Sequence, residues 1–196
     1  MRFAWLGVLI AFAANAEGDP ADGTRLQLCW LDADGRYPLM VEPMKREVVS
    51  ILGATGIEVV WLDALRAPTG PVLGVTLMKE PPATWRVPAH AMGATPVQAA
   101  KREAVYVFLP AIMRALGLDP RMERLPTPRE RIEIARAIAR VVVHEVVHVV
   151  APGVDHGETS VMRQALSRHA LQQEGARIEP EVADALRAGV KRFHGN

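Results

Sequence analysis

Four short stretches in the first two thirds of the chain are rich in apolar and β-prone residues and are bounded by turn residues. They span residues 25–32, 57–62, 72–78 and 104–109. Each pattern predicts a β-strand. A weaker stretch, AHAMGATPV at residues 89–97, predicts a short strand at a sheet edge, because Gly93 and Pro96 disfavour a central position.

Helical periodicity dominates three other stretches, at residues 41–52, 128–151 and 180–193. The second begins with TPRE, in which Thr127 is a helix N-cap and Glu130 completes a capping box. It continues to Ala151, where Pro152-Gly153 ends it, so the helix should be about 35 Å long. Its second half is apolar on nearly every face, which predicts a helix buried between two layers.

The order of these elements predicts an α+β fold with a small mixed sheet. We expect a single domain over residues 17–196. Within it, a sheet lobe covers about residues 24–126, the long helix about 128–151, and a small helical lobe about 152–196.

The first sixteen residues have the pattern of a secretory signal peptide. Arg2 precedes an apolar run, and Ala14-Asn15-Ala16 is a small-x-small cleavage site. We therefore expect a secreted or periplasmic protein that begins near Glu17 and has no membrane span, since the apolar run is too short for one. The chain has 23 Lys and Arg against 22 Asp and Glu, and losing Arg2 balances them. Neutrality gives no electrostatic reason to expect nucleic acid or an anionic membrane as a partner.

Cys29 is the single cysteine, so an internal disulfide is excluded. Stability must come from packing or from a metal. The position of Cys29 in a predicted strand favours a small buried hydrophobic side chain.

The long helix carries HEVVH, in which His144 and His148 project from one face about one turn apart. Two imidazoles at this spacing can bind one Zn²⁺ at about 2.0–2.1 Å. Glu145 can then serve as the general base for a water on the metal. Burying these groups in a valine-rich helix is costly unless they are paired, and a metal would resolve that cost.

A third ligand is expected shortly after the helix, because the Pro152-Gly153 stop lets the chain turn back. His156 is the preferred candidate. The alternatives left open are Asp155, Glu158, His169 and Glu174.

The stretch HEVVHVVAPGVDH, followed six residues later by Met162, resembles the metzincin clan of zinc peptidases. It is especially similar to small exported bacterial zincin-like proteins. The resemblance implies a zincin-like fold, His144, His148 and His156 as zinc ligands, Glu145 as the base and Met162 as the methionine of the tight turn beneath the metal. It also implies that Ser167 caps a short helix. Two features depart from the pattern: the third histidine follows the second by eight residues instead of six, and no tyrosine follows Met162.

The leading hypothesis is therefore a secreted zinc metallopeptidase acting on peptides or proteins, with the edge strand near residues 91–97 holding an extended substrate. One alternative is a non-catalytic, zinc-stabilised binding protein on a zincin scaffold. Another is a zinc hydrolase of non-peptide amides.

Overall fold

A computed structural model describes residues 24–32, 38–62, 68, 70–95, 104–157, 161–163 and 166–194. The predicted signal peptide lies outside these residues. The strands are β1 (Arg25–Asp32), β2 (Glu58–Leu62), β3 (Val72–Met78), β4 (Gly93–Ala94) and β5 (Ala104–Phe108). The helices are α1 (Pro38–Gly53), α2 (Leu109–Ala115), α3 (Pro128–Val150), α4 (Arg168–Gln172) and α5 (Pro180–His194). No helix among the described residues is long and apolar enough to cross a bilayer.

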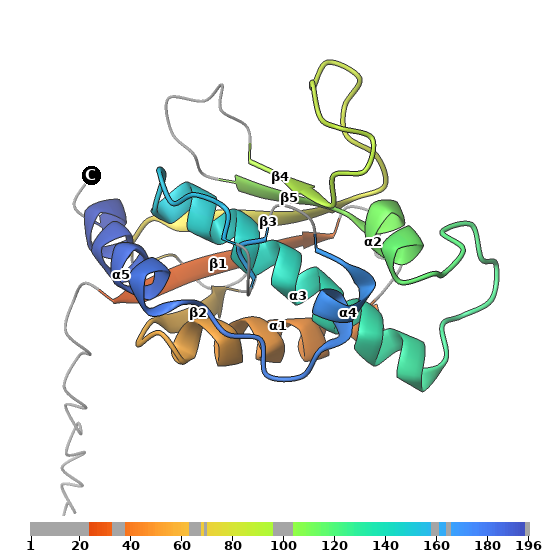
Figure 1. Cartoon of the computed structure of the whole chain (residues 1–196), viewed down its shortest axis with the longest axis horizontal. Helices are drawn as coiled ribbons and strands as arrows, with labels where there is room; N and C mark the ends of the chain where they lie inside the picture. The colour runs from red at the N-terminus through yellow and green to blue at the C-terminus, as the bar shows by residue number, and fades with distance from the viewer. Residues whose placement is uncertain are drawn as a thin grey trace, which may run out of the picture.

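The strands form one mixed sheet in the order β2-β1-β3-β5-β4 (Figure 1). The pairs β1–β2, β1–β3 and β3–β5 are parallel, and β4 runs antiparallel to β5 at the edge. Side chains of β3 alternate between buried and partly buried positions, as expected for a strand covered by helices on one face. This architecture confirms the predicted α+β class and its small mixed sheet.

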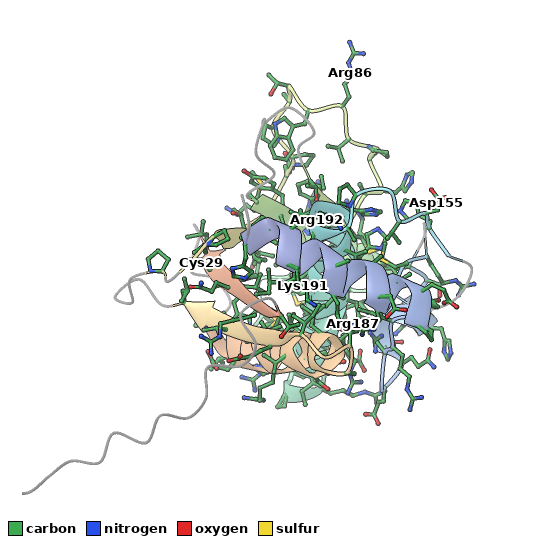
Figure 2. All side chains as sticks on the ribbon, turned by 90° about the vertical axis from the view of Figure 1, so that its left-hand side faces the viewer. Cys29, Arg86, Asp155, Arg187, Lys191 and Arg192 are labelled. Atoms are coloured by element: carbon green, nitrogen blue, oxygen red, sulfur yellow. The ribbon has the colours of Figure 1, made fainter. Side chains whose placement is uncertain are left out.

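The structure confirms the four stronger predicted strands. It shortens the expected edge strand to Gly93–Ala94, and its last residues, 96 and 97, lie outside the described residues. Met92 extends the edge, because its carbonyl accepts a 2.8 Å hydrogen bond from the backbone N–H of Phe108. Between β3 and β4 the chain forms a projecting loop with Arg86 near its tip (Figure 2).

Helix α3 begins at the predicted cap. The Thr127 hydroxyl accepts a 3.2 Å hydrogen bond from the backbone N–H of Glu130, whose carboxylate accepts a 2.7 Å bond from the N–H of Thr127. Fourteen residues of α3 are buried, most of them in its second half, so its stability comes mainly from tertiary packing. Helix α1 lies beside α3, and both cover one face of the sheet (Figure 1).

Helix α4 lies against α3 and is held there by arginine side chains. The buried Arg140 donates a hydrogen bond to the carbonyl of Ala170, and Arg136 donates one of 3.1 Å to the carbonyl of Gln172. Burial lowers the pKa of Arg140, while Glu47 on α1, 4.0 Å away, opposes the shift. The predicted cap of α4 is confirmed, since the Ser167 hydroxyl accepts from the N–H of Ala170.

Helix α5 packs against the C-terminal end of α3. A Cβ on Gly189 would lie 2.1 Å from the carbonyl oxygen of Val150, so only glycine permits this approach. Arg187 adds a 2.7 Å hydrogen bond to the carbonyl of Thr55, in the turn after α1. The end of α3 is therefore enclosed, and the chain that leaves it must turn back along the helix.

Cys29 is a free cysteine on β1 and is only partly buried, so its side chain is less enclosed than the sequence predicts.

Candidate metal centre

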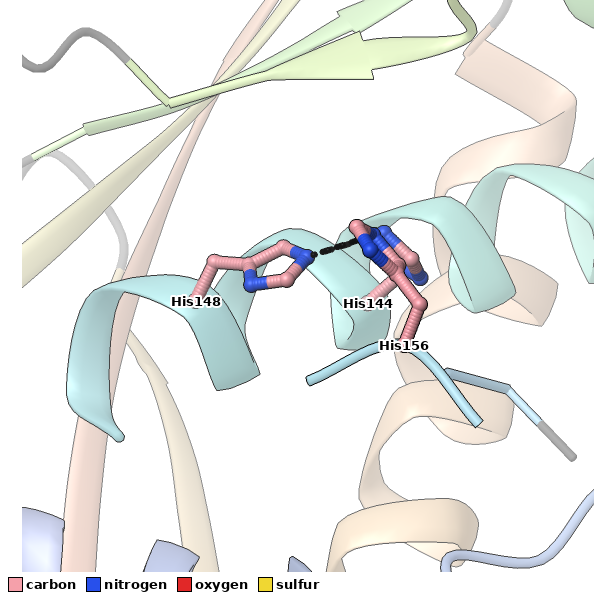
Figure 3. A group of neighbouring side chains, drawn as sticks. All are labelled: His144, His148 and His156. Carbon is pink, nitrogen blue, oxygen red and sulfur yellow. Dashed lines mark hydrogen bonds between the residues drawn. The ribbon is translucent and has the colours of Figure 1, made fainter. Parts of the chain in front are cut away.

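Three histidines converge at the second half of α3 (Figure 3). The Nε2 atom of His148 lies 3.1 Å from Nε2 of His144 and 3.2 Å from Nε2 of His156. The ligand nitrogens of all three lie within 4.8 Å of one another, so these residues could hold a metal ion. His144 and His148 are partly buried on the helix, whereas His156 comes from the exposed loop that follows it.

The turn after α3 brings His156 back to the helix. Gly153 has a φ of 102°, and the N–H of Val154 donates a 3.2 Å hydrogen bond to the carbonyl of Ala151. Proline at the second position and a positive-φ glycine at the third are the residue preferences of a type II turn. The loop between His148 and His156 is two residues longer than in the metzincin pattern. The tight turn at Pro152-Gly153 reverses the chain, so His156 still reaches the other two histidines.

The three other candidate ligands that the structure describes do not join this cluster. Asp155 is exposed beside His156, and Glu174 instead pairs with Arg136 at 3.1 Å. His169 lies on α4 and lines a different cavity. Glu158 lies outside the described residues.

Residues 161–163 form a second turn, which anchors two of the histidines. The carbonyl of Val161 lies 2.9 Å from Nδ1 of His144, and the carbonyl of Met162 accepts a 2.9 Å hydrogen bond from the N–H of Gly157. Gly157 directly follows His156, so this second bond fixes the loop that carries it. Met162 itself is fully buried.

The donor set fits zinc. Because Nδ1 of His144 donates to the Val161 carbonyl, its proton is placed there and the Nε2 lone pair faces the cluster. Burial lowers the pKa of His144, which favours the neutral form that binds metals. Nitrogen ligands around a tetrahedral zinc stand about 3.3–3.4 Å apart, close to the separations observed here. One proton on His148 Nε2 could satisfy only one of its two neighbours, whereas a metal satisfies all three.

Glu145 lies beside the histidines and is buried, with 8% of its surface exposed. The Thr95 hydroxyl donates a 3.0 Å hydrogen bond to Oε2 of Glu145. Burial raises the pKa of Glu145 to about 7, and the hydrogen bond from Thr95 opposes the shift. A Cβ on Gly93 would lie 2.8 Å from both Cγ and Oε1 of Glu145, so the glycine of β4 provides the space for the carboxylate.

A cleft of about 630 Å³ opens beside this group. One wall of the cleft is formed by His144, Glu145 and His156. Its other walls come from residues 88–93, from helix α2 and from the segment that follows Met162. The site therefore combines a cluster that could hold a metal, a buried carboxylate and an open space next to a sheet edge.

Several residues of this site escaped the sequence analysis. Gly93, Thr95 and the Val161 carbonyl contribute only through contacts between distant segments. Helix α2 was also missed, because its N-cap residue, Phe108, makes no side-chain capping bond and its apolar sequence continues that of β5.

The mixed sheet, the long helix and the three-histidine cluster together define a metzincin-like, zincin-type fold, as the motif resemblance implies. A solved structure with this fold is archaemetzincin from Methanopyrus kandleri. It superimposes with a TM-score of 0.53 at 17% sequence identity, over 87% of this chain and 98% of that one. No protein-family model matches the sequence, and no curated protein matches it either.

Proposed function

We propose that this chain is a zinc metallopeptidase that hydrolyses peptide bonds in the cleft beside Glu145. The observation that carries the proposal is the convergence of three imidazole nitrogens next to a buried carboxylate that lines the same open cleft. His144, His148 and His156 would hold the metal, and Met162 would be the buried methionine of the turn below it. The metzincin-like fold supports this assignment.

Glu145 would serve as the general base. When bound, zinc acts as a Lewis acid that acidifies water and polarises a carbonyl group. Glu145 would accept the proton of the attacking water and return it to the leaving amine. Thr95 would hold Oε2 of the carboxylate during both transfers, because its hydroxyl donates to that oxygen.

Strand β4 would position the substrate. It is the outermost strand of the sheet in the described part of the chain, and it borders the cleft through Gly93. An extended peptide could pair with the free side of such a strand through main-chain hydrogen bonds. The scissile bond would then lie alongside Glu145, which contacts Gly93.

The test is a comparison of the wild type with Glu145→Gln, both loaded with zinc. The variant should retain one zinc per chain and lose peptide hydrolysis by a factor of about 10²–10⁴, the usual contribution of a general base. Unchanged hydrolysis in Glu145→Gln would contradict the proposal. Stoichiometric zinc with no hydrolysis by the wild type, across a broad peptide library, would favour the non-catalytic binding protein. Hydrolysis only of non-peptide amides would favour the other alternative.

We also propose that the protein is exported, because residues 1–16 have the charge, apolar run and cleavage site of a signal peptide. Mass spectrometry of the protein from an extracytoplasmic fraction should show a chain that begins at Glu17. An intact Met1 on cytoplasmic protein would be the contrary result.

A further inference from the structure

Two arginines also line the cleft. Arg114 comes from α2 and Arg163 directly follows Met162, and both are exposed. Neither forms an ion pair within the described part of the chain. His90 also lines the cleft, from the segment before β4. The cleft therefore presents two unpaired guanidinium groups from different elements.

The opposite charge is scarce here. Glu145 is the only acidic residue among the described residues that line the cleft. A second cavity of about 800 Å³ shares Arg163 with the cleft and adds the exposed Arg177, with Glu179 as the one acid among the described residues that line it. Positive charge thus extends along the wall beyond the candidate metal centre.

Arginine in such a position has a specific use. Its planar guanidinium binds a carboxylate through two parallel hydrogen bonds, with more directional selectivity than an ammonium group provides. Apolar side chains, including Val141 and Leu166, also line the cleft. Beside such walls a charge pair is weakened less by solvent than in bulk water.

We propose that Arg114 and Arg163 select substrates with an aspartate or glutamate next to the scissile bond. This inference rests on the proposed peptidase function and deepens it by naming the substrate class. The two guanidinium groups bind the substrate carboxylate, and the like-charge repulsion that they exert excludes lysine and arginine from the same position.

The experiment uses internally quenched peptides that are identical except for Glu, Gln or Lys at one position, placed on either side of the scissile bond. For the zinc-loaded wild type, kcat/KM for the Glu peptide should exceed that for the Gln peptide by about tenfold, and the Lys peptide should be poorest. The excess should fall as salt is raised, because charge pairs in an open cleft are screened.

Charge reversal provides the decisive variant. Arg114→Glu combined with Arg163→Glu should abolish the preference for Glu and make the Lys peptide the better substrate. Lys191→Glu combined with Arg192→Glu makes the same change of charge on two exposed residues of α5 (Figure 2) and should leave the Glu-to-Gln ratio as in the wild type. An inverted preference cannot arise from misfolding, which would lower all rates together.

Peptide-binding measurements distinguish the selectivity for acidic substrates from the peptidase activity itself. Fluorescein-labelled Glu and Gln peptides are titrated onto zinc-loaded Glu145→Gln, and anisotropy reports their affinities. Hydrolysis with equal rates for Glu and Gln, or a ratio unaltered by charge reversal, overturns the selectivity and leaves the peptidase function intact. If the wild type hydrolyses no peptide, the peptidase function fails. Tighter binding of the Glu peptide then still supports acidic recognition, and equal binding overturns it.

Discussion

A methyl group on Gly93 should displace the carboxylate of Glu145, because the heavy atoms nearest to that methyl group belong to Glu145 and Val141. The Cβ of Gly93→Ala would lie 2.8 Å from Cγ and Oε1 of Glu145 and 2.8 Å from Cγ1 of Val141. Ordinary carbon contacts are about 3.5–4.0 Å, so a gap of roughly 1 Å must open. Val141 is buried in the middle of α3, whereas the Glu145 side chain can rotate about its own bonds. Glu145 should therefore move.

The structure sets the size of the effect. Overpacking of this kind lowers the free energy of unfolding by about 1–3 kcal/mol. Rotation of Glu145 also breaks its 3.0 Å hydrogen bond from Thr95. If the carboxylate leaves its place completely, kcat/KM should fall by about 10²–10⁴, the full contribution of a general base.

The assay combines zinc content, peptide hydrolysis and thermal unfolding of Gly93→Ala. Zinc should remain at one per chain, because the three heavy atoms nearest to the added Cβ belong to Glu145 and Val141 and not to a histidine. Gly53→Ala is the matched control, since a Cβ at that position meets no heavy atom within 4 Å and should leave zinc content and hydrolysis as in the wild type. A Gly93→Ala protein with wild-type kcat/KM would refute the reasoning that the position of Glu145 beside β4 is required.

Two further predictions concern the elements that support the site. Gly153→Ala should lower zinc affinity and cost about 1–2 kcal/mol of stability, because Gly153 has a positive φ in the turn that returns His156. The control is Gly175→Ala, also at positive φ, which should lower stability but not zinc affinity. Equal zinc affinities of the two variants would contradict the role of the turn. Arg124 and the Thr127 cap lower the pKa of Glu130 to about 2 from 4.5, so this carboxylate stabilises the fold above about pH 4.5 and the stabilisation is lost as the pH falls through 2. Between about pH 2 and 4.5, the melting temperature of Glu130→Gln should vary less with pH than that of the wild type. Identical pH profiles of the two proteins would contradict a stabilising role of the Glu130 carboxylate.

Local patterns in the sequence were sufficient for the elements on which the site is built. The capping box of Thr127 and Glu130 is a contact between near neighbours, so the start of α3 can be read directly from four residues. The shared face of His144 and His148 follows from helix geometry alone. The zincin-type fold was implied by the resemblance of the HEVVH stretch to the metzincin clan.

Contacts between distant segments could not be predicted in the same way. Thr95 bonds to Glu145 across 50 residues of sequence, and nothing in the stretch around Thr95 indicates its partner. Glu174 was a reasonable candidate ligand until the structure placed it beside Arg136. The position of Arg114 in the cleft could not be predicted either, because Arg114 belongs to helix α2, whose start has no side-chain cap that the sequence would reveal.

Metal analysis of the purified protein, wild type beside His156→Ala, shows whether the three histidines bind zinc. The wild type should contain one zinc per chain, and His156→Ala should bind zinc much more weakly, because it removes one of three nitrogens that lie within 4.8 Å of one another. A wild-type chain that binds no zinc, or a His156→Ala variant that binds it equally well, would contradict the account.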